Sequence, residues 1–132
     1  MKAIMVLGDS KRGKTTTFWA LRERLKSLGW IETLFDEEAN PDNDFVSEME
    51  YKGEKLALVS MGDFSWYSVF KMNKYNSKNY DVLVFACNMG KARPQNRFVQ
   101  FEDRHIVEKN EPNDIDNERA INEIVEHISR LV

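Results

Sequence analysis

The first 29 residues combine a short apolar run, a loop bounded by two glycines and an amphipathic segment. Residues 2–7 (KAIMVL) are nearly all apolar, which is typical of a strand buried on both faces of a parallel sheet. From Lys14 to Leu28 the apolar side chains recur at helical spacing, and Gly29 follows where a helix C-terminal glycine belongs. This order predicts the first unit of an α/β fold in which helices cover a mainly parallel sheet.

The loop of this unit reads GDSKRGKT and fits the pattern G-x-x-x-x-G-K-[ST] without a mismatch. Gly13 permits backbone torsions that turn successive N–H groups toward phosphate oxygens, and the helix dipole adds positive potential there. Lys14 is expected to reach the β and γ phosphates, and the Thr15 hydroxyl is expected to bind Mg²⁺. The residues expected to bind the nucleotide are Gly8, Asp9, Ser10, Lys11, Arg12, Gly13, Lys14, Thr15 and Thr16.

This loop resembles the phosphate-binding loop of the P-loop NTPases. A second apolar run, Leu56 to Met61, ends just before Asp63. The resemblance implies that Asp63 lies beside the Thr15 hydroxyl and completes the Mg²⁺ site. Because the residues from Phe64 onward have a helical pattern, Asp63 has the alternative role of a helix N-cap. The resemblance also implies a three-layer α/β P-loop fold, here as a single domain over residues 1–132.

The rest of the chain continues the alternation of strands and helices. The short turn at 52–54 joins two strands into an antiparallel hairpin, which adds one antiparallel edge to the sheet. Residues 90–103 have no clear pattern. Three aromatic residues follow Asp63 at helical spacing: Trp66, Tyr67 and Phe70. They are expected in the core. The alternative is that they stack on the base of a nucleotide that accepts the phosphoryl group. Strands are predicted over 30–35, 45–51, 55–61, 80–87 and 105–107, and helices over 64–75 and after an N-cap at Asp116.

Two branches of the superfamily share features with this chain. The small GTPases also place a hairpin before the metal carboxylate, but N-K-x-D is missing after the strand that ends at Cys87, and D-x-x-G is missing at Asp63. ATP is therefore the expected nucleotide. The small nucleotide kinases carry an arginine-bearing lid, for which Arg93 and Arg97 stand in the corresponding place.

The expected function is phosphoryl transfer from ATP and Mg²⁺ to a nucleotide or another small acceptor. The residues expected to act in catalysis are Lys14, Asp63, Arg93 and Arg97, and those expected to hold Mg²⁺ are Thr15 and Asp63. Two alternatives stay open: a slow NTP-hydrolysing switch or accessory protein, and a non-catalytic nucleotide-binding module. The sequence names neither the base, nor the acceptor, nor the oligomeric state.

Charge and composition limit the possible partners. The chain has 19 basic and 22 acidic residues, a net charge of −3, which argues against coating of nucleic acid by bulk charge but leaves room for a local basic site. One cysteine excludes an intramolecular disulfide framework. Because no apolar run approaches 18 residues, we expect no membrane span and a soluble, cytoplasmic protein.

Overall fold

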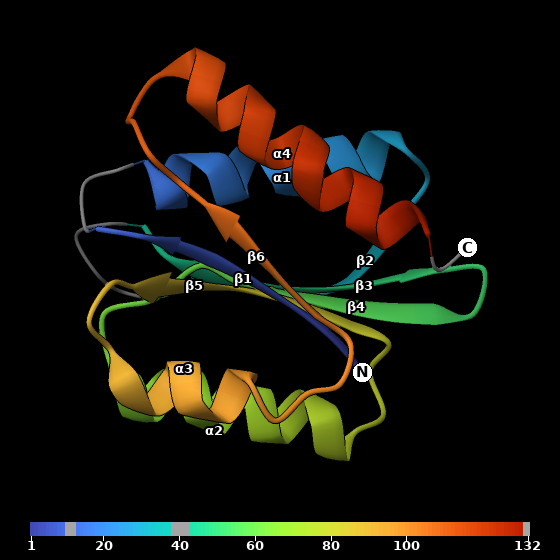
Figure 1. The fold of residues 1–132 in the computed structure, drawn as a ribbon. Coiled ribbons are helices and arrows are strands. Elements are labelled where there is room, and N and C mark those ends of the chain that lie inside the picture. The colour runs from blue at the N-terminus through green and yellow to red at the C-terminus, as the bar shows by residue number, and fades with distance from the viewer. Residues whose placement is uncertain (10–12, 38–42, 131–132) are drawn as a thin grey trace.

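The computed structural model describes residues 1–9, 13–37 and 43–130, and these build one six-stranded sheet with helices on both faces (Figure 1). The strand order across the sheet is β2-β3-β4-β5-β1-β6. The elements in chain order are β1 Lys2–Gly8, α1 Lys14–Ser27, β2 Ile31–Glu37, β3 Phe45–Tyr51, β4 Glu54–Val59, α2 Ser65–Ser77, β5 Val82–Asn88, α3 Ala92–Phe98, β6 Arg104–Glu108 and α4 Asp114–Ser129.

The strands β4, β5, β1 and β6 run parallel to one another, whereas β3 runs antiparallel to both of its neighbours, β2 and β4. The predicted mainly parallel sheet with an antiparallel hairpin is confirmed at this level. The expectation that the hairpin forms an edge of the sheet is wrong, because β2 pairs along the outer side of β3. Most β2 side chains are exposed, as suits an edge strand held mainly by its backbone hydrogen bonds.

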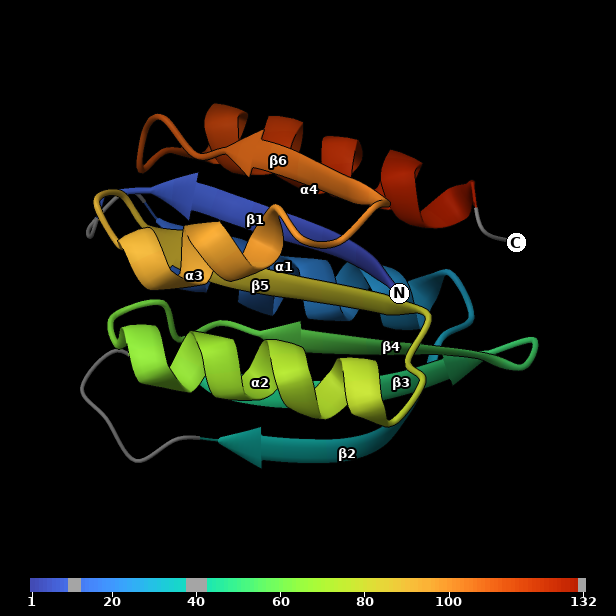
Figure 2. The same ribbon diagram turned by 60° about the horizontal axis from the view of Figure 1, so that its bottom comes forward.

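The helices divide into two pairs, with α1 and α4 on one face of the sheet and α2 and α3 on the other (Figures 1 and 2). The central strands are apolar on both faces, so each pair of helices closes its own core. Between the sheet and the pair α1 and α4, the large fully buried side chains include Ile4, Phe18, Leu21, Leu25, Phe45 and Leu58. Between the sheet and the pair α2 and α3, they include Met5, Met72, Tyr75, Phe85 and Phe98. Each such burial stabilises the fold by roughly 1.5–3 kcal/mol.

Two predicted details differ from the structure. The unpatterned segment 90–103 contains α3. The predicted N-cap of the last helix, Asp116, lies inside α4, and the side chain of Asn113 caps the helix instead by accepting a hydrogen bond from the Asp116 backbone N–H at 2.8 Å. The Asp116 carboxylate accepts a hydrogen bond from Lys109, 2.8 Å away, so it is not aimed at the helix terminus. None of the helices in the described ranges combines the length and the apolar character needed to cross a bilayer.

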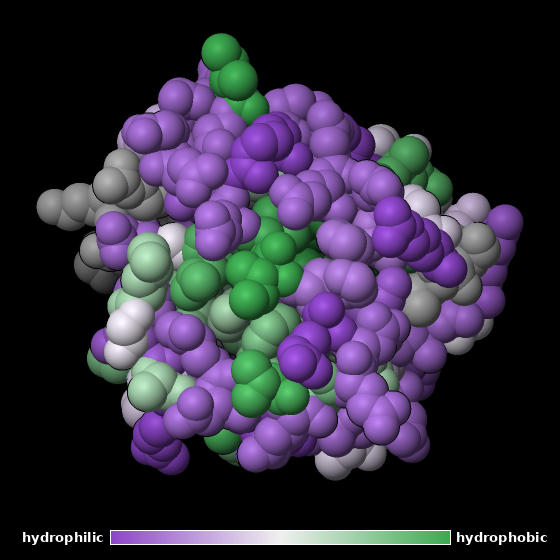
Figure 3. Space-filling view, in the orientation of Figure 1, coloured by the Kyte–Doolittle hydropathy of each residue, from purple (hydrophilic) through white to green (hydrophobic). Residues whose placement is uncertain are grey.

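The second edge of the sheet is β6, which lies toward the viewer in Figure 1. The space-filling view in the same orientation shows apolar side chains gathered over this strand and polar residues around them (Figure 3). Ile106 of β6 is an exposed member of the strand, whereas Val107 is buried.

The parallel strands bring their carboxyl ends to the same edge of the sheet, on the left in Figure 1. Because β3 runs in the opposite direction, its first residues lie at this edge too. The amino ends of α1, α2 and α3 follow directly on strand ends, so they begin at the same edge. In open α/β sheets this edge is where ligands bind.

Candidate functional site

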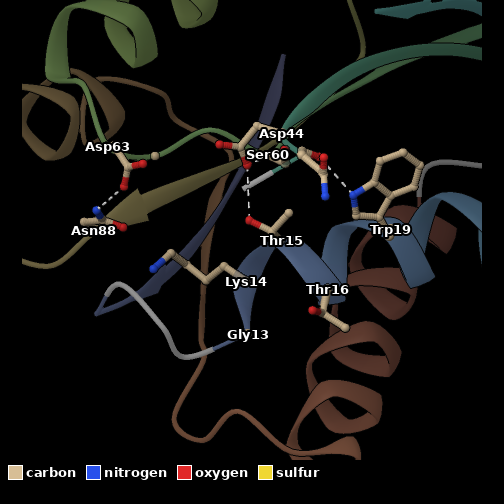
Figure 4. Close-up of a pocket in the computed structure, with 11 residues that line it drawn as sticks. Gly13, Lys14, Thr15, Thr16, Trp19, Asp44, Ser60, Asp63 and Asn88 are labelled. Carbon is tan, nitrogen blue, oxygen red and sulfur yellow. Dashed lines mark hydrogen bonds between the residues drawn. The ribbon is translucent and has the colours of Figure 1, made fainter. Parts of the chain in front are cut away.

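A cavity of about 510 Å³ opens at the carboxyl edge of the parallel strands, a volume within the range of small-molecule sites (Figure 4). The start of α1, the start of β3 and the segments that follow β4 and β5 form its wall. The lining residues are Gly13, Lys14, Thr15, Thr16, Trp19, Asn43, Asp44, Ser60, Gly62, Asp63 and Asn88.

The start of α1 forms one wall of the cavity. Gly13 has φ +78° and ψ 22°, a left-handed conformation that glycine adopts without a steric penalty. The helix begins at the next residue, and its N-cap, Gly13, has no side chain that could cap the N–H groups of the first turn. Free N–H groups and the positive end of the helix dipole favour an anion at this place.

Lys14 adds a positive charge beside these N–H groups. Its Nζ donates hydrogen bonds to the carbonyl oxygens of Gly8, at 2.8 Å, and Asp9, at 2.7 Å. Burial lowers the pKa of Lys14, and the carboxylates of Asp63 and Asp9 partly offset this effect. The ammonium group is thus held within the loop that precedes α1, where it can interact with a bound anion.

Thr15 lies opposite a buried carboxylate. Its Oγ1 donates a hydrogen bond to Oδ1 of Asp44 at 3.1 Å, and the Ser60 hydroxyl donates to the same oxygen at 2.9 Å. Asp44 is only 2% exposed. The Ser60 oxygen also accepts a hydrogen bond from the Phe45 N–H at 2.9 Å, which ties the start of β3 to the end of β4.

The Thr15 and Asp44 oxygens, which form a hydrogen bond, are of the chemical kind that Mg²⁺ takes as ligands. Mg²⁺ prefers oxygen ligands in an octahedron with bonds of about 2.1 Å. Within the described ranges, no three or more His, Cys, Asp or Glu side chains form a group able to hold a metal. Nucleotide-bound Mg²⁺ uses only one or two carboxylates, together with phosphate oxygens and water.

Asp63 forms the side of the cavity nearest to β5. The Asn88 amide Nδ2 donates a hydrogen bond to the Asp63 Oδ1 at 2.8 Å (Figure 4). The alternative role of Asp63 as the N-cap of α2 is wrong, because the N-cap is Phe64. Glycine at position 62 lets the segment that carries Asp63 pass close to β5, since a Cβ atom at Gly62 would lie 2.9 Å from the backbone of Ala86.

Trp19 and Thr16 complete the cavity on the side of α1. The indole Nε1 of Trp19 donates to the Asn43 carbonyl at 3.0 Å, and its ring packs against Phe45 with 4.7 Å between the ring centroids. Thr16 is exposed at the rim. An aromatic wall beside a phosphate-type anion site is a place where a flat ligand group can pack.

The structure does not bring the two expected lid arginines to the cavity. Arg97 donates from Nε to Oδ1 of Asn73 in α2 at 2.8 Å, and its guanidinium lies 4.4 Å from the ring centroid of Phe101. Arg93 is exposed at the start of α3. Neither residue lines the cavity, because α3 packs beside α2 over the face of the sheet.

The remaining predicted binding residues have different places. Ser10, Lys11 and Arg12 lie outside the described residues. Gly8 and Asp9 contribute their backbone carbonyls to Lys14 and do not line the cavity.

Sequence reasoning missed Asp44, Ser60 and Asn88. Asp44 belongs to an acidic stretch that reads as a solvated loop, and its burial depends on the antiparallel direction of β3. For Asn88 the available signal was position, because it ends an apolar run, where the sheet edge collects side chains; Asp44 precedes a strand and had no such signal. No family model, curated protein or solved structure matches the chain.

Proposed function

We propose that this chain binds a nucleoside triphosphate, with ATP as the expected nucleotide, together with Mg²⁺, and that its fold is that of the P-loop NTPases. One observation carries the proposal: a buried lysine, a threonine hydroxyl and two carboxylates face the same cavity at a helix amino end. The lysine and the threonine belong to a phosphate-loop motif that the sequence matches at every position, and the two carboxylates come from outside it.

The triphosphate would lie across the start of α1. The N–H groups after Gly13 donate to phosphate oxygens, and Lys14 supplies the compensating charge. The two carbonyl partners of Lys14 keep its ammonium at the loop in the absence of a ligand, so little reorganisation is needed when the anion binds. Trp19 stands at the rim as an apolar surface for the remainder of the nucleotide.

Thr15, Asp44 and Asp63 are the residues that would hold Mg²⁺. The metal, when bound, neutralises charge on the β and γ phosphate oxygens. Asp44 and Ser60 fix the direction of the Thr15 hydroxyl, and Asn88 fixes the Asp63 carboxylate. Groups held in this way cost little reorganisation when they act.

The activity that we propose is transfer of the γ-phosphoryl group, with water as the acceptor. Lys14 stabilises the charge that develops on the transferred group. Asn88 and Asp63 present an amide and a carboxylate that can orient a water molecule. Transfer to a nucleotide, the function expected from the sequence and here the kinase alternative, needs further cationic donors, and the arginines expected for that role lie outside the cavity.

Calorimetric titration of the wild type and of Lys14→Ala with ATP and Mg²⁺ tests the binding proposal. We expect the variant to lose at least about tenfold in affinity, because charged hydrogen bonds contribute roughly 1.5–3 kcal/mol each. Lys26→Ala is the matched control, since Lys26 is exposed near the end of the same helix. Equal affinity of wild type and Lys14→Ala would overturn the proposal.

Phosphate and ADP release, measured with and without a panel of nucleoside monophosphates, test the reaction. Release of inorganic phosphate in the absence of any acceptor is the expected result. Acceleration of ADP release by one monophosphate, without free phosphate, would establish the kinase alternative. Binding without release of either product would leave a non-catalytic module.

A further inference from the structure

The helices α2 and α3 lie side by side over one face of the sheet (Figure 2), and α2 and the residue before it carry exposed aromatic rings. Trp66 is 61% exposed and Phe70 is 58% exposed, and Phe64 is about half exposed. Of Trp66, Tyr67 and Phe70, which were expected in the core, only Tyr67 is buried. Large apolar groups gathered on a surface mark places where other molecules bind.

The same part of the chain holds a concentration of positive charge. Residues 65–98 contain six basic residues and one acidic residue, a net charge of +5. The rest of the chain has 13 basic and 21 acidic residues, a net charge of −8. The acidic residues are concentrated in residues 32–50, which contain eight acidic residues and no basic one. The overall charge of −3 thus hides a basic region that bulk composition does not reveal.

The rings and the cations lie along the same helices. Trp66 and Phe70 are four residues apart and share one side of α2. Asn73, three residues farther on, accepts a hydrogen bond from Arg97, so the side of α2 that bears the rings continues onto α3. The other basic residues of this region are Lys71, Lys74, Lys78, Lys91 and Arg93.

Three acidic residues near this face are engaged in internal contacts, whereas Glu102 and Asp103, which follow α3, are exposed. Glu48 is buried beneath α2, where its two carboxylate oxygens accept hydrogen bonds from Tyr75 and Tyr80, both at 2.8 Å. Asp81 accepts from the Lys55 backbone N–H at 2.8 Å, and Asp63 lies at the cavity beyond the start of α2. These contacts leave the outer side of α2 and α3 to aromatic, amide and basic side chains.

We infer that the face formed by α2 and α3 binds single-stranded nucleic acid. Bases that are not paired can stack on exposed aromatic rings, while lysine and arginine contact the phosphates of the same strand. A duplex hides the faces of its bases, so it can use the cations but not the rings. A membrane surface fits less well, because Asn73, Asn76 and Ser77 border the rings on α2 and would be pushed toward the acyl chains.

This inference stands apart from the proposed function, since it uses none of the residues that line the cavity. The two surfaces are nevertheless adjacent, because Asp63 of the cavity is followed directly by Phe64. Because Lys14 lies in the cavity and not on the α2/α3 face, Lys14→Ala is expected to bind the oligonucleotide as the wild type does.

Fluorescence anisotropy with a labelled thymidine oligonucleotide of about 20 residues, longer than a typical binding site, measures the interaction. We expect the single strand to bind more tightly than a duplex of equal length. Affinity should fall as salt rises from about 50 to about 200 mM, because bound cations are released from the phosphates. Failure to bind at the lowest salt, or equal binding of strand and duplex, would overturn the inference.

Variants separate stacking from charge. Trp66→Ala is expected to lower the affinity by about tenfold, and Trp66→Phe, which keeps a ring, to restore most of it. Removing a cation with Lys78→Ala is expected to reduce the slope of log affinity against log salt by about 0.7. Lys26→Ala, on the opposite face, is the matched control and should leave the slope unchanged.

Further outcomes would also overturn the inference. Variants at Trp66 and Lys78 that bind like the wild type would place the oligonucleotide elsewhere on the protein. Binding to vesicles that contain phosphatidylserine, without binding of the oligonucleotide, would identify a membrane surface instead. Thermal unfolding by circular dichroism checks that each variant keeps its fold, which is expected because both side chains are exposed.

Discussion

The Thr15 hydroxyl donates a hydrogen bond to the buried carboxylate of Asp44, across 29 residues of sequence and 3.1 Å of space. The two residues come from the start of α1 and from the residue before β3, and both line the cavity. A carboxylate so deeply buried is retained at a cost, since desolvation of a charge opposes folding. Its place beside Thr15 accords with the proposal that it supplies a negatively charged ligand for Mg²⁺.

Asp44→Asn is predicted to weaken the binding of ATP in the presence of Mg²⁺ by about tenfold, because the variant removes one charged metal ligand and keeps the side-chain shape. Binding measured in the presence of a chelator should change little. Titration with Mg²⁺ at fixed ATP checks the prediction. Asp36→Asn in the exposed part of β2 is the control. Equal Mg²⁺ dependence of wild type and Asp44→Asn would exclude Asp44 from the metal site.

Asp63→Asn is predicted to lower turnover by at least about tenfold, about 1.4 kcal/mol of barrier, with little change in the stability of the nucleotide-free protein. The reason is structural: the N-cap of α2 is Phe64, so Asp63 does not cap that helix, and its charge beside the helix start contributes only about 0.3–1 kcal/mol. The asparagine oxygen can still accept from Asn88. Thermal unfolding and phosphate release should be measured on the same samples. A large loss of stability with intact turnover would make Asp63 a structural residue only.

The sequence predicted the sheet better than it predicted the site. The apolar runs and the glycine-bounded loop are local signals, so they were sufficient for the central strands and for the placement of Lys14 and Thr15. The partner of Thr15 was not accessible in this way. Asp44 enters the cavity only because β3 runs against its neighbours, and pairing between strands is a non-local property.

The lid prediction had a different weakness. Arg93 and Arg97 follow a strand, as lid arginines do, and their spacing of four residues indicated a shared helical face. Spacing says which residues of a helix lie together but not what the face contacts. In the structure Arg97 contacts α2 and Phe101.

A buried ion pair behind the loop makes stability depend on pH. Lys109, whose side chain is fully buried, donates to Asp116 at 2.8 Å, and its Nζ lies 3.7 Å from where a Cβ atom of Gly13 would be. Burial alone would raise the pKa of Asp116, but hydrogen bonds from Lys109, from the Glu111 N–H and from Arg119 hold it well below its usual value. The stabilisation is therefore complete above about pH 4 and is lost as the pH falls toward the lowered value.

Asp116→Asn is predicted to lower the free energy of unfolding by about 3–5 kcal/mol at neutral pH, because the Lys109 charge stays buried without its partner. The loss of stability in acid should then be shallower than in the wild type. Urea unfolding between pH 7 and pH 3 measures both effects. Glu126→Gln, which removes an exposed pair with Arg130, is the control and should cost less than about 1 kcal/mol. An unchanged acid profile in Asp116→Asn would contradict the assignment.

Arg97→Ala is predicted to affect stability and not turnover. The guanidinium makes one hydrogen bond to Asn73 and lies over the Phe101 ring, contacts that together contribute about 1 kcal/mol. A donor that stabilised the transferred phosphoryl group would instead lower turnover by tenfold or more, about 1.4 kcal/mol of barrier. Asn73→Ala removes the same hydrogen bond from the side of α2 and should reproduce part of the loss of stability, because the contact of Arg97 with the Phe101 ring remains. If Arg97→Ala lowers turnover tenfold while Asn73→Ala leaves it intact, the arginine moves to the cavity during the reaction and the kinase alternative regains its support.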